Sequence, residues 1–271
     1  MLSFQKMQDC FTPIKICMPA GYFFYFFYFC SKRKFTMKMM ESIIDLNNEA
    51  INQYEWGEFC QAEDFLMYAL SELYNLQKKV QNEVSNESSI QSKWCYIKGW
   101  SKSFSFSKEQ DGAIMNSRAI VLKENAPHYH LDNAQAISHH LKVLEMVLCY
   151  NAAILHHLYS FFTGRNSDVI DTAYHYYENA FSSYTKIKQA ESNLSFEIKA
   201  LKSILFHNMG VLYCNNFCRY DDAKKCFRAF QSEMNKMDKR KLIDLGLMTK
   251  EEVYQFLHNF LAVPRSAAPA A

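Results

Sequence analysis

The stretch HNMGVLYCNNFCRYDDAKKCFRAF, residues 207–230, has the pattern of two amphipathic helices joined by a short polar turn. Its second half carries apolar residues at steps of three, four and three: Tyr220, Ala223, Phe227 and Phe230. Steps of this size place all four side chains on one face of a helix. The fold of the chain therefore depends on whether this helix pair stands alone or is repeated.

Two further segments show the same spacing. They carry it at Phe59, Ala62, Leu66 and Ala69, and at Ile170, Ala173, Tyr177 and Ala180. In each copy the second position is a small Ala, and a bulky residue follows four positions later. A small residue lets the neighbouring helix approach closely, and the bulky one fills the space above it.

The helices that precede these segments also align. An aliphatic residue, an Asn and a small residue recur at fixed offsets: Ile44, Asn48 and Ala50; Val147, Asn151 and Ala153; Ile204, Asn208 and Gly210. One amphipathic pair would be a weak observation, since any helical bundle contains several. Three pairs that match at seven positions indicate internal repetition.

On these residues the chain resembles the tetratricopeptide-repeat (TPR) family. The small residue of the first helix, the aromatic Tyr213, the turn Gly57-Glu58-Phe59 and the Ala of the second helix match the family pattern. The resemblance implies an all-α fold, an α-solenoid of stacked antiparallel helix pairs. Ala62 and Ala173 are 111 residues apart and Ala173 and Ala223 are 50 apart. The family repeats every ~34 residues, so we expect a divergent and interrupted array.

The predicted organisation has a leader, one TPR-like domain and a disordered tail. These parts are residues 1–37, 38–262 and 263–271. Within the domain we expect helix pairs near 41–84, 134–190 and 198–240, an insertion at 85–133 and a capping helix at 249–262. The capping helix is predicted from Thr249-x-x-Glu252, the pattern of a capping box. It would cover the exposed face of the last pair, as stacked arrays require.

The insertion breaks the helical pattern. WCYIKGWSKSFSFS, residues 94–107, alternates aromatic with polar residues, as a short strand or β-hairpin does. AIMNSRAIVL, residues 113–122, is compatible with another strand or with a helical turn.

The leader contains an apolar block, ICMPAGYFFYFFYFC at residues 16–30. Its 15 residues are short for a membrane span, which needs about 20. Lys32, Arg33 and Lys34 follow it, where a secreted chain would carry a small-residue cleavage site. Three readings stay open: a disordered or wrongly assigned leader with the true start at Met37, Met39 or Met40, a cytosol-facing anchor, and secretion.

Composition excludes some classes of function. The chain has 30 Lys and Arg against 28 Asp and Glu, so it lacks the clustered basic charge that nucleic-acid binding requires. Its nine cysteines contain no Cys-x-x-Cys and are expected to be reduced, as in the cytoplasm or nucleus. With 49% hydrophobic residues and only seven Gly and five Pro, the composition favours a helical chain with a sizeable core.

No catalytic, metal or cofactor site is predicted. The doublets His139-His140 and His156-His157 each offer one ligand at most, because adjacent residues on a helix point about 100° apart. Phosphate-binding loops, nucleophile elbows and zinc-protease motifs are absent from the sequence. We therefore expect a non-catalytic protein. An enzyme of unrecognised family on a helical scaffold and a membrane-tethered adaptor are the alternatives.

The resemblance implies a concave groove lined by the first helix of each pair, where an Asn holds the backbone of an extended peptide. The predicted groove residues are Asn48, Gln53, Asn151, His156, Asn208 and Tyr213. Aliphatic residues occupy the places where members that bind acidic C-terminal tails carry Lys or Arg. The competing interpretation is structural: each Asn satisfies carbonyls between neighbouring helices. We expect a protein-interaction scaffold that binds a peptide or helix, with the partner left open.

Overall fold

The computed structural model describes residues 20–81, 97–100, 115, 117–122, 134–162, 167–191, 193–244 and 248–252. The helices are α1 (Ala20–Trp56), α2 (Phe59–Gln81), α3 (Ala134–Phe162), α4 (Ser167–Ala190), α5 (Phe196–Asn215), α6 (Tyr220–Lys236) and α7 (Lys239–Asp244). The strands are β1 (Ile97–Trp100) and β2 (Ile120–Leu122). Internal contacts divide the chain into two units, Met1–Lys38 and Met39–Ala271.

In the first unit the described residues, 20–38, are helical and form the start of α1. Residues 16–19 of the apolar block, and the side chains of the rest of that block, lie outside the described residues. Within the described ranges, no helix combines the length and the apolar composition that crossing a membrane requires.

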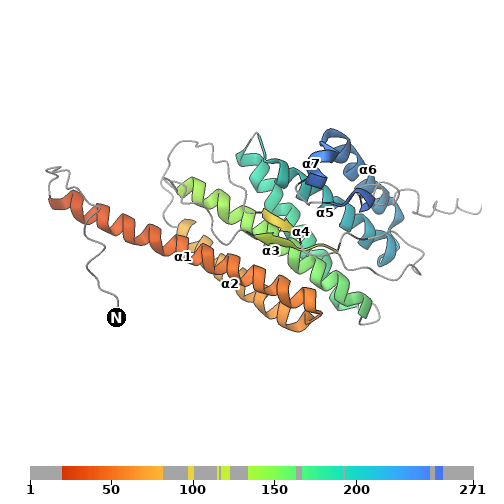
Figure 1. Ribbon diagram of the computed structural model, residues 1–271, viewed down its shortest axis with the longest axis horizontal. Helices are drawn as coiled ribbons and strands as arrows, with labels where there is room; N and C mark the ends of the chain where they lie inside the picture. Colours follow the sequence, from red (N-terminus) through yellow and green to blue (C-terminus); the bar gives the residue numbers. More distant parts are fainter. Residues whose placement is uncertain are drawn as a thin grey trace, which may run out of the picture. The chain divides into compact units, whose positions relative to one another are not determined.

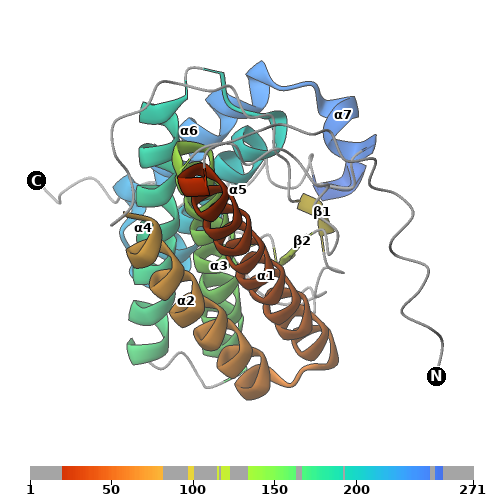
Figure 2. The ribbon, with the colours of Figure 1, turned by 90° about the vertical axis from the view of Figure 1, so that its left-hand side faces the viewer.

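The second unit is built from helix pairs that pack in the order of the sequence. The C-terminal part of α1 pairs with α2, α3 with α4, and α5 with α6, and α3 also packs against α2 (Figure 1). Seen along the bundle, α2, α3 and α4 lie next to one another (Figure 2). The predicted all-α class with antiparallel packing of successive helices is confirmed.

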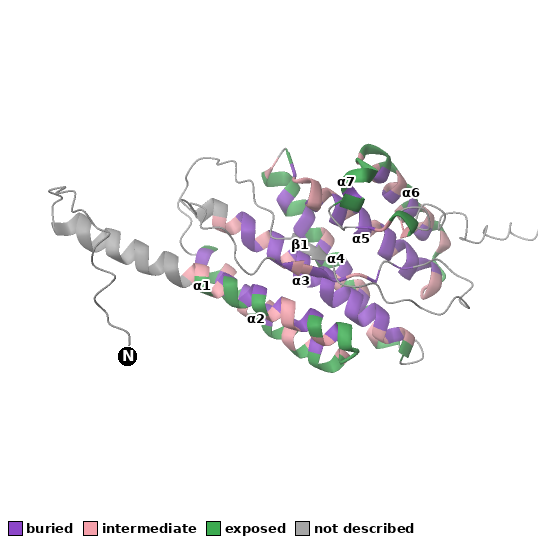
Figure 3. Ribbon diagram, in the orientation of Figure 1, coloured by how far each residue is buried: buried purple, intermediate pink, exposed green. Residues whose placement is uncertain are grey.

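The predicted apolar faces of the second helices point into the core. The small and bulky residues of the repeated spacing are buried in all three helices: Ala62, Leu66 and Ala69; Ala173, Tyr177 and Ala180; Ala223, Phe227 and Phe230. Helix α3 is different, because nearly every residue from His139 to Leu158 is buried (Figure 3). A helix that is apolar on all sides is stable only when other elements surround it, and α3 therefore forms the centre of the unit.

The middle pair is longer than its neighbours. Ala153 and Ala173 are 20 residues apart in the sequence, and α3 continues to Phe162 while α4 already begins at Ser167. The extra residues therefore lengthen both helices by about a turn. Most of the residues that separate Ala153 from Ala173 are therefore helical.

A backbone feature that only glycine adopts without strain ends α1. Gly57 has φ of 83°, and the N–H groups of Gly57 and Glu58 donate to the carbonyls of Tyr54 and Gln53. This is a Schellman motif, in which a left-handed residue closes the helix and turns the chain. It sets the tight connection to α2.

The two segments predicted as strands pair with each other. Strands β1 and β2 are antiparallel, with Ile97 opposite Leu122, Gly99 opposite Val121 and Trp100 opposite Ile120, and with an irregularity between Ile97 and Gly99. They are separated by residues 101–119, so they are not the two arms of a tight hairpin.

The capping box predicted before the last helix is confirmed. The Thr249 N–H donates to Glu252 Oε2 at 2.7 Å, and the Glu252 N–H donates to Thr249 Oγ1 at 3.1 Å. Residues 250–252 are helical. The rest of the predicted capping helix and the tail at 263–271 lie outside the described residues.

The contact between Gly210 and Phe227 yields a test of the helix-pair packing. A Cβ at Gly210 would lie 2.7 Å from Phe227 Cε1, and that ring is buried. Overpacking of a buried ring costs about 1–3 kcal/mol, which exceeds the gain of about 1 kcal/mol from replacing a helical Gly by Ala. We expect Gly210→Ala to lower the free energy of unfolding in urea by about 1–2 kcal/mol.

The control is the same substitution in a Phe227→Leu background, where the smaller side chain leaves room for the methyl group. There Gly210→Ala should be neutral or stabilising. An equal loss in both backgrounds would show that Phe227 does not set the requirement for Gly.

Candidate functional site

An extended segment of the insertion lies between the first helices of the first two pairs. Residues 117–122, here called the bound segment, run alongside α1 and α3. In Figure 2 its strand β2 lies on the side of these helices that faces away from α2 and α4. Ile120 and Leu122 are both 0% exposed, and Ser117 and Ala119 are also buried.

Asn151 of α3 holds both backbone groups of Ile120. The Ile120 N–H donates to Asn151 Oδ1 at 2.8 Å, and Asn151 Nδ2 donates to the Ile120 carbonyl at 3.0 Å. The primary amide thus pairs with the peptide group as a neighbouring strand would. Because the site is buried, water does not compete for these bonds.

Asn48 of α1 holds Leu122 in the same way. The Leu122 N–H donates to Asn48 Oδ1 and Asn48 Nδ2 donates to the Leu122 carbonyl, both at 2.9 Å. Alternate residues of a strand direct their N–H and C=O groups to the same edge. Ile120 and Leu122 therefore present one edge to the two asparagines, while β1 pairs along the other edge.

Asn47 joins the two halves of this arrangement. Its Nδ2 donates to the Ile120 carbonyl at 3.1 Å and to Asn48 Oδ1 at 3.3 Å, and its Oδ1 accepts from Asn151 Nδ2 at 2.7 Å. It is 0% exposed. Asn47, Asn48 and Asn151 together form what we call the asparagine clamp.

Two tyrosines hold the start of the bound segment. The Tyr54 hydroxyl donates to the Ser117 carbonyl, and the Tyr150 hydroxyl donates to the Arg118 carbonyl at 3.2 Å. Burial raises the pKa of both hydroxyls well above the ordinary value for tyrosine. Both therefore stay protonated and act as donors throughout the physiological range.

The side chain of Arg118 is held by the last described helix. Arg118 Nε lies 3.0 Å from Glu252 Oε1, and the two side chains are 15% and 12% exposed. Glu252 Oε2 accepts the capping-box bond from Thr249. One carboxylate oxygen is thus fixed by the helix start, and the other is directed at the guanidinium of the bound segment.

The third predicted asparagine, Asn208, makes none of the hydrogen bonds to the bound segment described above. Asn208 of α5 is buried and its side chain hydrogen-bonds the hydroxyls of Tyr150 and Tyr177. Tyr150 in turn donates to the Arg118 carbonyl, so Asn208 is linked to the bound segment indirectly, through the Tyr150 hydroxyl.

The other predicted groove residues lie elsewhere. Gln53 Nε2 donates to Glu49 Oε1 of the same helix at 2.8 Å. His156 stacks on Tyr176, with ring centroids 5.5 Å apart, and its Nε2 lies 3.6 Å from Glu63 Oε1. Burial lowers the pKa of His156 more than Glu63 raises it.

Tyr213 belongs to an aromatic cluster of α4 and α5. Its ring lies 5.9 Å from that of Tyr174 and 6.3 Å from that of Phe217, and the Arg219 guanidinium lies 4.8 Å above it. Of the six predicted groove residues, Asn48 and Asn151 hydrogen-bond the bound segment, and the contacts described for the other four are with residues elsewhere in the fold.

Sequence reasoning missed Asn47, Tyr54 and Tyr150. Asn47 precedes Asn48 in the sequence and falls on the apolar side of α1, which is a detectable pattern for a buried hydrogen-bonded group. The tyrosines carry no comparable pattern, because an aromatic residue on an apolar face is equally expected in the core.

The histidine doublets do not converge. His139 lies near Glu191, while His157 Nδ1 lies 3.3 Å from the Tyr177 hydroxyl and its ring stacks on Phe161. Across the described ranges, no group of three or more His, Cys, Asp or Glu side chains is arranged to hold a metal ion.

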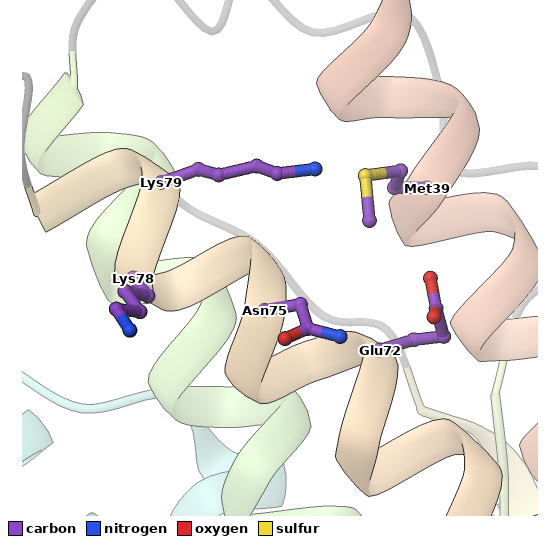
Figure 4. A pocket seen from close by; sticks show the side chains of 5 residues that line it. All are labelled: Met39, Glu72, Asn75, Lys78 and Lys79. Atoms are coloured by element: carbon purple, nitrogen blue, oxygen red, sulfur yellow. The ribbon is translucent and has the colours of Figure 1, made fainter.

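A surface pocket of about 350 Å³ lies between α1 and α2 (Figure 4). It is lined by Met39, Glu72, Asn75, Lys78 and Lys79, none of which is a predicted groove residue. The Lys79 side chain extends across it toward Met39 (Figure 4). Its mixture of opposite charges is typical of a solvated helix surface and indicates no particular ligand.

Comparisons with known proteins found no match: no family model, no curated protein and no solved structure is similar to this chain.

The asparagine clamp predicts a ranking of mutational effects. Asn151→Ala removes three hydrogen bonds inside a buried site and leaves the Ile120 N–H without its acceptor. Buried groups left unpaired cost about 1–3 kcal/mol each, so we expect a loss of about 2–4 kcal/mol in the free energy of unfolding. Asn48 is half-buried, and water can replace part of its bonds, so Asn48→Ala should cost about 1–2 kcal/mol.

The matched control is Gln53→Ala, on the same helix as Asn48. Its amide bonds only Glu49, so the expected loss is below about 0.5 kcal/mol. Urea unfolding followed by circular dichroism measures all three variants. If Asn151→Ala and Gln53→Ala cost the same, the clamp would not stabilise the fold.

Three buried histidines predict how stability depends on pH. Burial lowers the pKa of His140 and His157 to about 3 and that of His207 to about 4. In the unfolded chain histidine titrates near ~6.5, so below that pH only the unfolded state takes up these protons. Stability is therefore complete above pH ~6.5 and falls as the pH drops toward 4, by up to about 1.4 kcal/mol per pH unit for each histidine.

Urea unfolding at pH 7.5, 6.0 and 5.0 measures this slope. His140→Leu removes one of the buried histidines, so the slope between pH 6 and 5 should fall by up to about 1.4 kcal/mol per pH unit. An unchanged slope would mean that His140 is protonated in the folded protein.

Proposed function

We propose that this chain is a non-catalytic protein-interaction scaffold of TPR-like helix pairs that binds extended peptide backbone through the asparagine clamp. Three helix pairs with the same small and bulky residues at the same places support the TPR-like part of the proposal. The position of Asn48 and Asn151 on the first helices supports the binding part.

One observation carries the proposal: the clamp already holds an extended segment, which belongs to the chain itself. Asn151 pairs with the N–H and the C=O of Ile120, and Asn48 pairs with those of Leu122, two positions further along the segment. Every peptide offers the same groups at the same spacing. The chemistry that binds residues 117–122 is therefore the chemistry that would bind a strand of another protein.

The proposed binding mode uses a smaller groove than the one predicted from the sequence. Its centre is the space between α1 and α3, with Tyr54 and Tyr150 at the start of the occupant and the clamp at its end. Asn208 supports it through Tyr150. Gln53, His156 and Tyr213 are not needed for the proposed binding mode.

The test requires a chain whose clamp is empty. In the full chain, Ile120→Asp with Leu122→Asp places two charges at positions that are 0% exposed, which should expel the bound segment. A fluorescein-labelled peptide with the sequence of residues 115–124 is then titrated and followed by fluorescence anisotropy. We expect a Kd on the order of 1–100 μM for this opened variant and no saturation with the wild-type chain, whose clamp is filled.

Two controls make the result specific to the clamp. A peptide N-methylated at the amide equivalent to Ile120 lacks the donor to Asn151 and should bind at least about tenfold more weakly. Adding Asn151→Ala to the opened variant should have a similar effect. A folded opened variant, verified by its helical circular dichroism and cooperative melting, that binds none of these peptides would refute the proposal. If the double Asp variant does not fold, replacing residues 117–122 by Gly and Ser empties the clamp without burying charge.

A further inference from the structure

The backbone contacts of the clamp cannot distinguish one sequence from another, so any selectivity must come from side chains of the occupant. Ile120 and Leu122 are completely buried, and Ala119 between α1 and α3 is buried as well. Val121, which lies between the two aliphatic residues, is only half-buried. The site thus accepts two aliphatic side chains two positions apart and restricts the preceding position to a small one.

At a fourth position, that of Arg118, the site selects a residue by its charge. Glu252 lies 3.0 Å from Arg118 in a contact that is mostly shielded from water, where an ion pair is stronger than at an open surface. The capping box fixes Glu252, so the carboxylate is held ready for a cation whatever occupies the clamp. An occupant with an acidic residue at this position would be repelled.

The segment that meets these requirements is part of a long connection. It lies between α2, which ends at Gln81, and α3, which begins at Ala134. An occupant tied to its site by the chain has an effective concentration on the order of millimolar, so only an outside segment of comparable chemistry can compete with it.

We infer that residues 117–122 are an internal copy of the binding segment of a partner protein. That partner presents, in extended conformation, a basic residue, then a small residue, then two aliphatic residues separated by one position, and it displaces the bound segment from the clamp. This inference rests on the proposed function and adds to it the identity of the peptide by chemical class.

The experiment measures displacement in the full chain by hydrogen exchange and mass spectrometry. The Ile120 and Leu122 N–H groups are bonded to the clamp, so their exchange reports whether the segment is bound. The probe is the peptide with the sequence of residues 115–124. With the wild-type chain, millimolar peptide should raise the exchange rate of the fragment covering residues 117–122 at least about tenfold, because the displaced amides lose protection.

Two variants distinguish the contribution of Arg118 in the bound segment from the contribution of Glu252 in the site. Arg118→Ala weakens only the internal segment, because Glu252 remains available to the Arg of the peptide. The peptide concentration for half-displacement should then fall about tenfold, the ratio expected for loss of a contact worth about 1.4 kcal/mol. Adding Glu252→Gln removes the ion pair for the peptide too, so half-displacement should return to the wild-type concentration. Gln at this position keeps the capping box, which protects the helix start.

Variant peptides test the side-chain requirements. Glu in place of the peptide's Arg, or Ser in place of both aliphatic residues, should reduce displacement at least about tenfold. Equal displacement by all peptides would leave the proposed function intact and overturn the sequence requirement. No displacement from the wild-type and Arg118→Ala chains, while the opened variant binds the peptide, would show that the bound segment is a permanent part of the fold.

A second copy of this chain is the competing occupant. If Arg118→Ala produces a concentration-dependent dimer by light scattering, in which the segment is exchanged between two copies, the partner would be the chain itself and the inference of a different protein would be wrong.

Discussion

The arrangement of the second unit depends on how a strand edge is buried against helices. A strand exposes a row of N–H and C=O groups along each edge, and burying such groups without partners is costly. A helix uses its own backbone groups internally and has none to offer to a neighbour. Side-chain amides solve this problem, because Asn carries one donor group and one acceptor at a spacing that fits a peptide unit. Asn48, Asn151 and Asn47 therefore replace the strand that would otherwise lie beside β2.

This solution sets the packing of the helix pairs. The bound segment lies between α1 and α3, and the hydrogen bonds it makes with these two helices involve side-chain amides and hydroxyls. Between α5 and α6 nothing intervenes, and Gly210 lies directly against the Phe227 ring. The residue two positions after the recurring Asn is Ala50 in the first pair, Ala153 in the second and Gly210 in the third.

Periodicity was sufficient to predict the helices of the three pairs, their pairing and their buried faces, because burial of an amphipathic face is a local property of the sequence. The short helix α7 was not predicted. The capping box at Thr249 and Glu252 was also predictable, since both partners lie within one turn. The segment that occupies the clamp could not be predicted. AIVL at residues 119–122 is compatible with a strand or with a helical turn. Nothing in its composition indicates which helices lie beside it, and the bonds from Asn48 and Asn47 span more than 70 positions.

Asn208 shows why repeated positions in a sequence need not share a role. It occupies the same place in its helix as Asn48 and Asn151, yet α5 faces Tyr150 and Tyr177 instead of a strand. Its amide therefore bonds hydroxyl groups of neighbouring helices, whereas the structural interpretation of the sequence expected backbone carbonyls. Through Tyr150 it still orients a donor for the Arg118 carbonyl.

In the proposed binding mode, the buried polar groups at the site have two different roles. The clamp and the tyrosines are neutral, and their bonds depend on the backbone of the occupant, so they provide affinity for any extended segment. Glu252 is the charged group at the site, and it is held outside the helix pairs, at the start of the last described helix. A residue without positive charge at the position of Arg118 leaves a carboxylate that is mostly removed from water without its partner, and a polar residue at either aliphatic position enters a site that is 0% exposed. In the proposed binding mode, selectivity therefore comes from the ion pair and from the two aliphatic side chains, while the helices supply a general means of holding a strand.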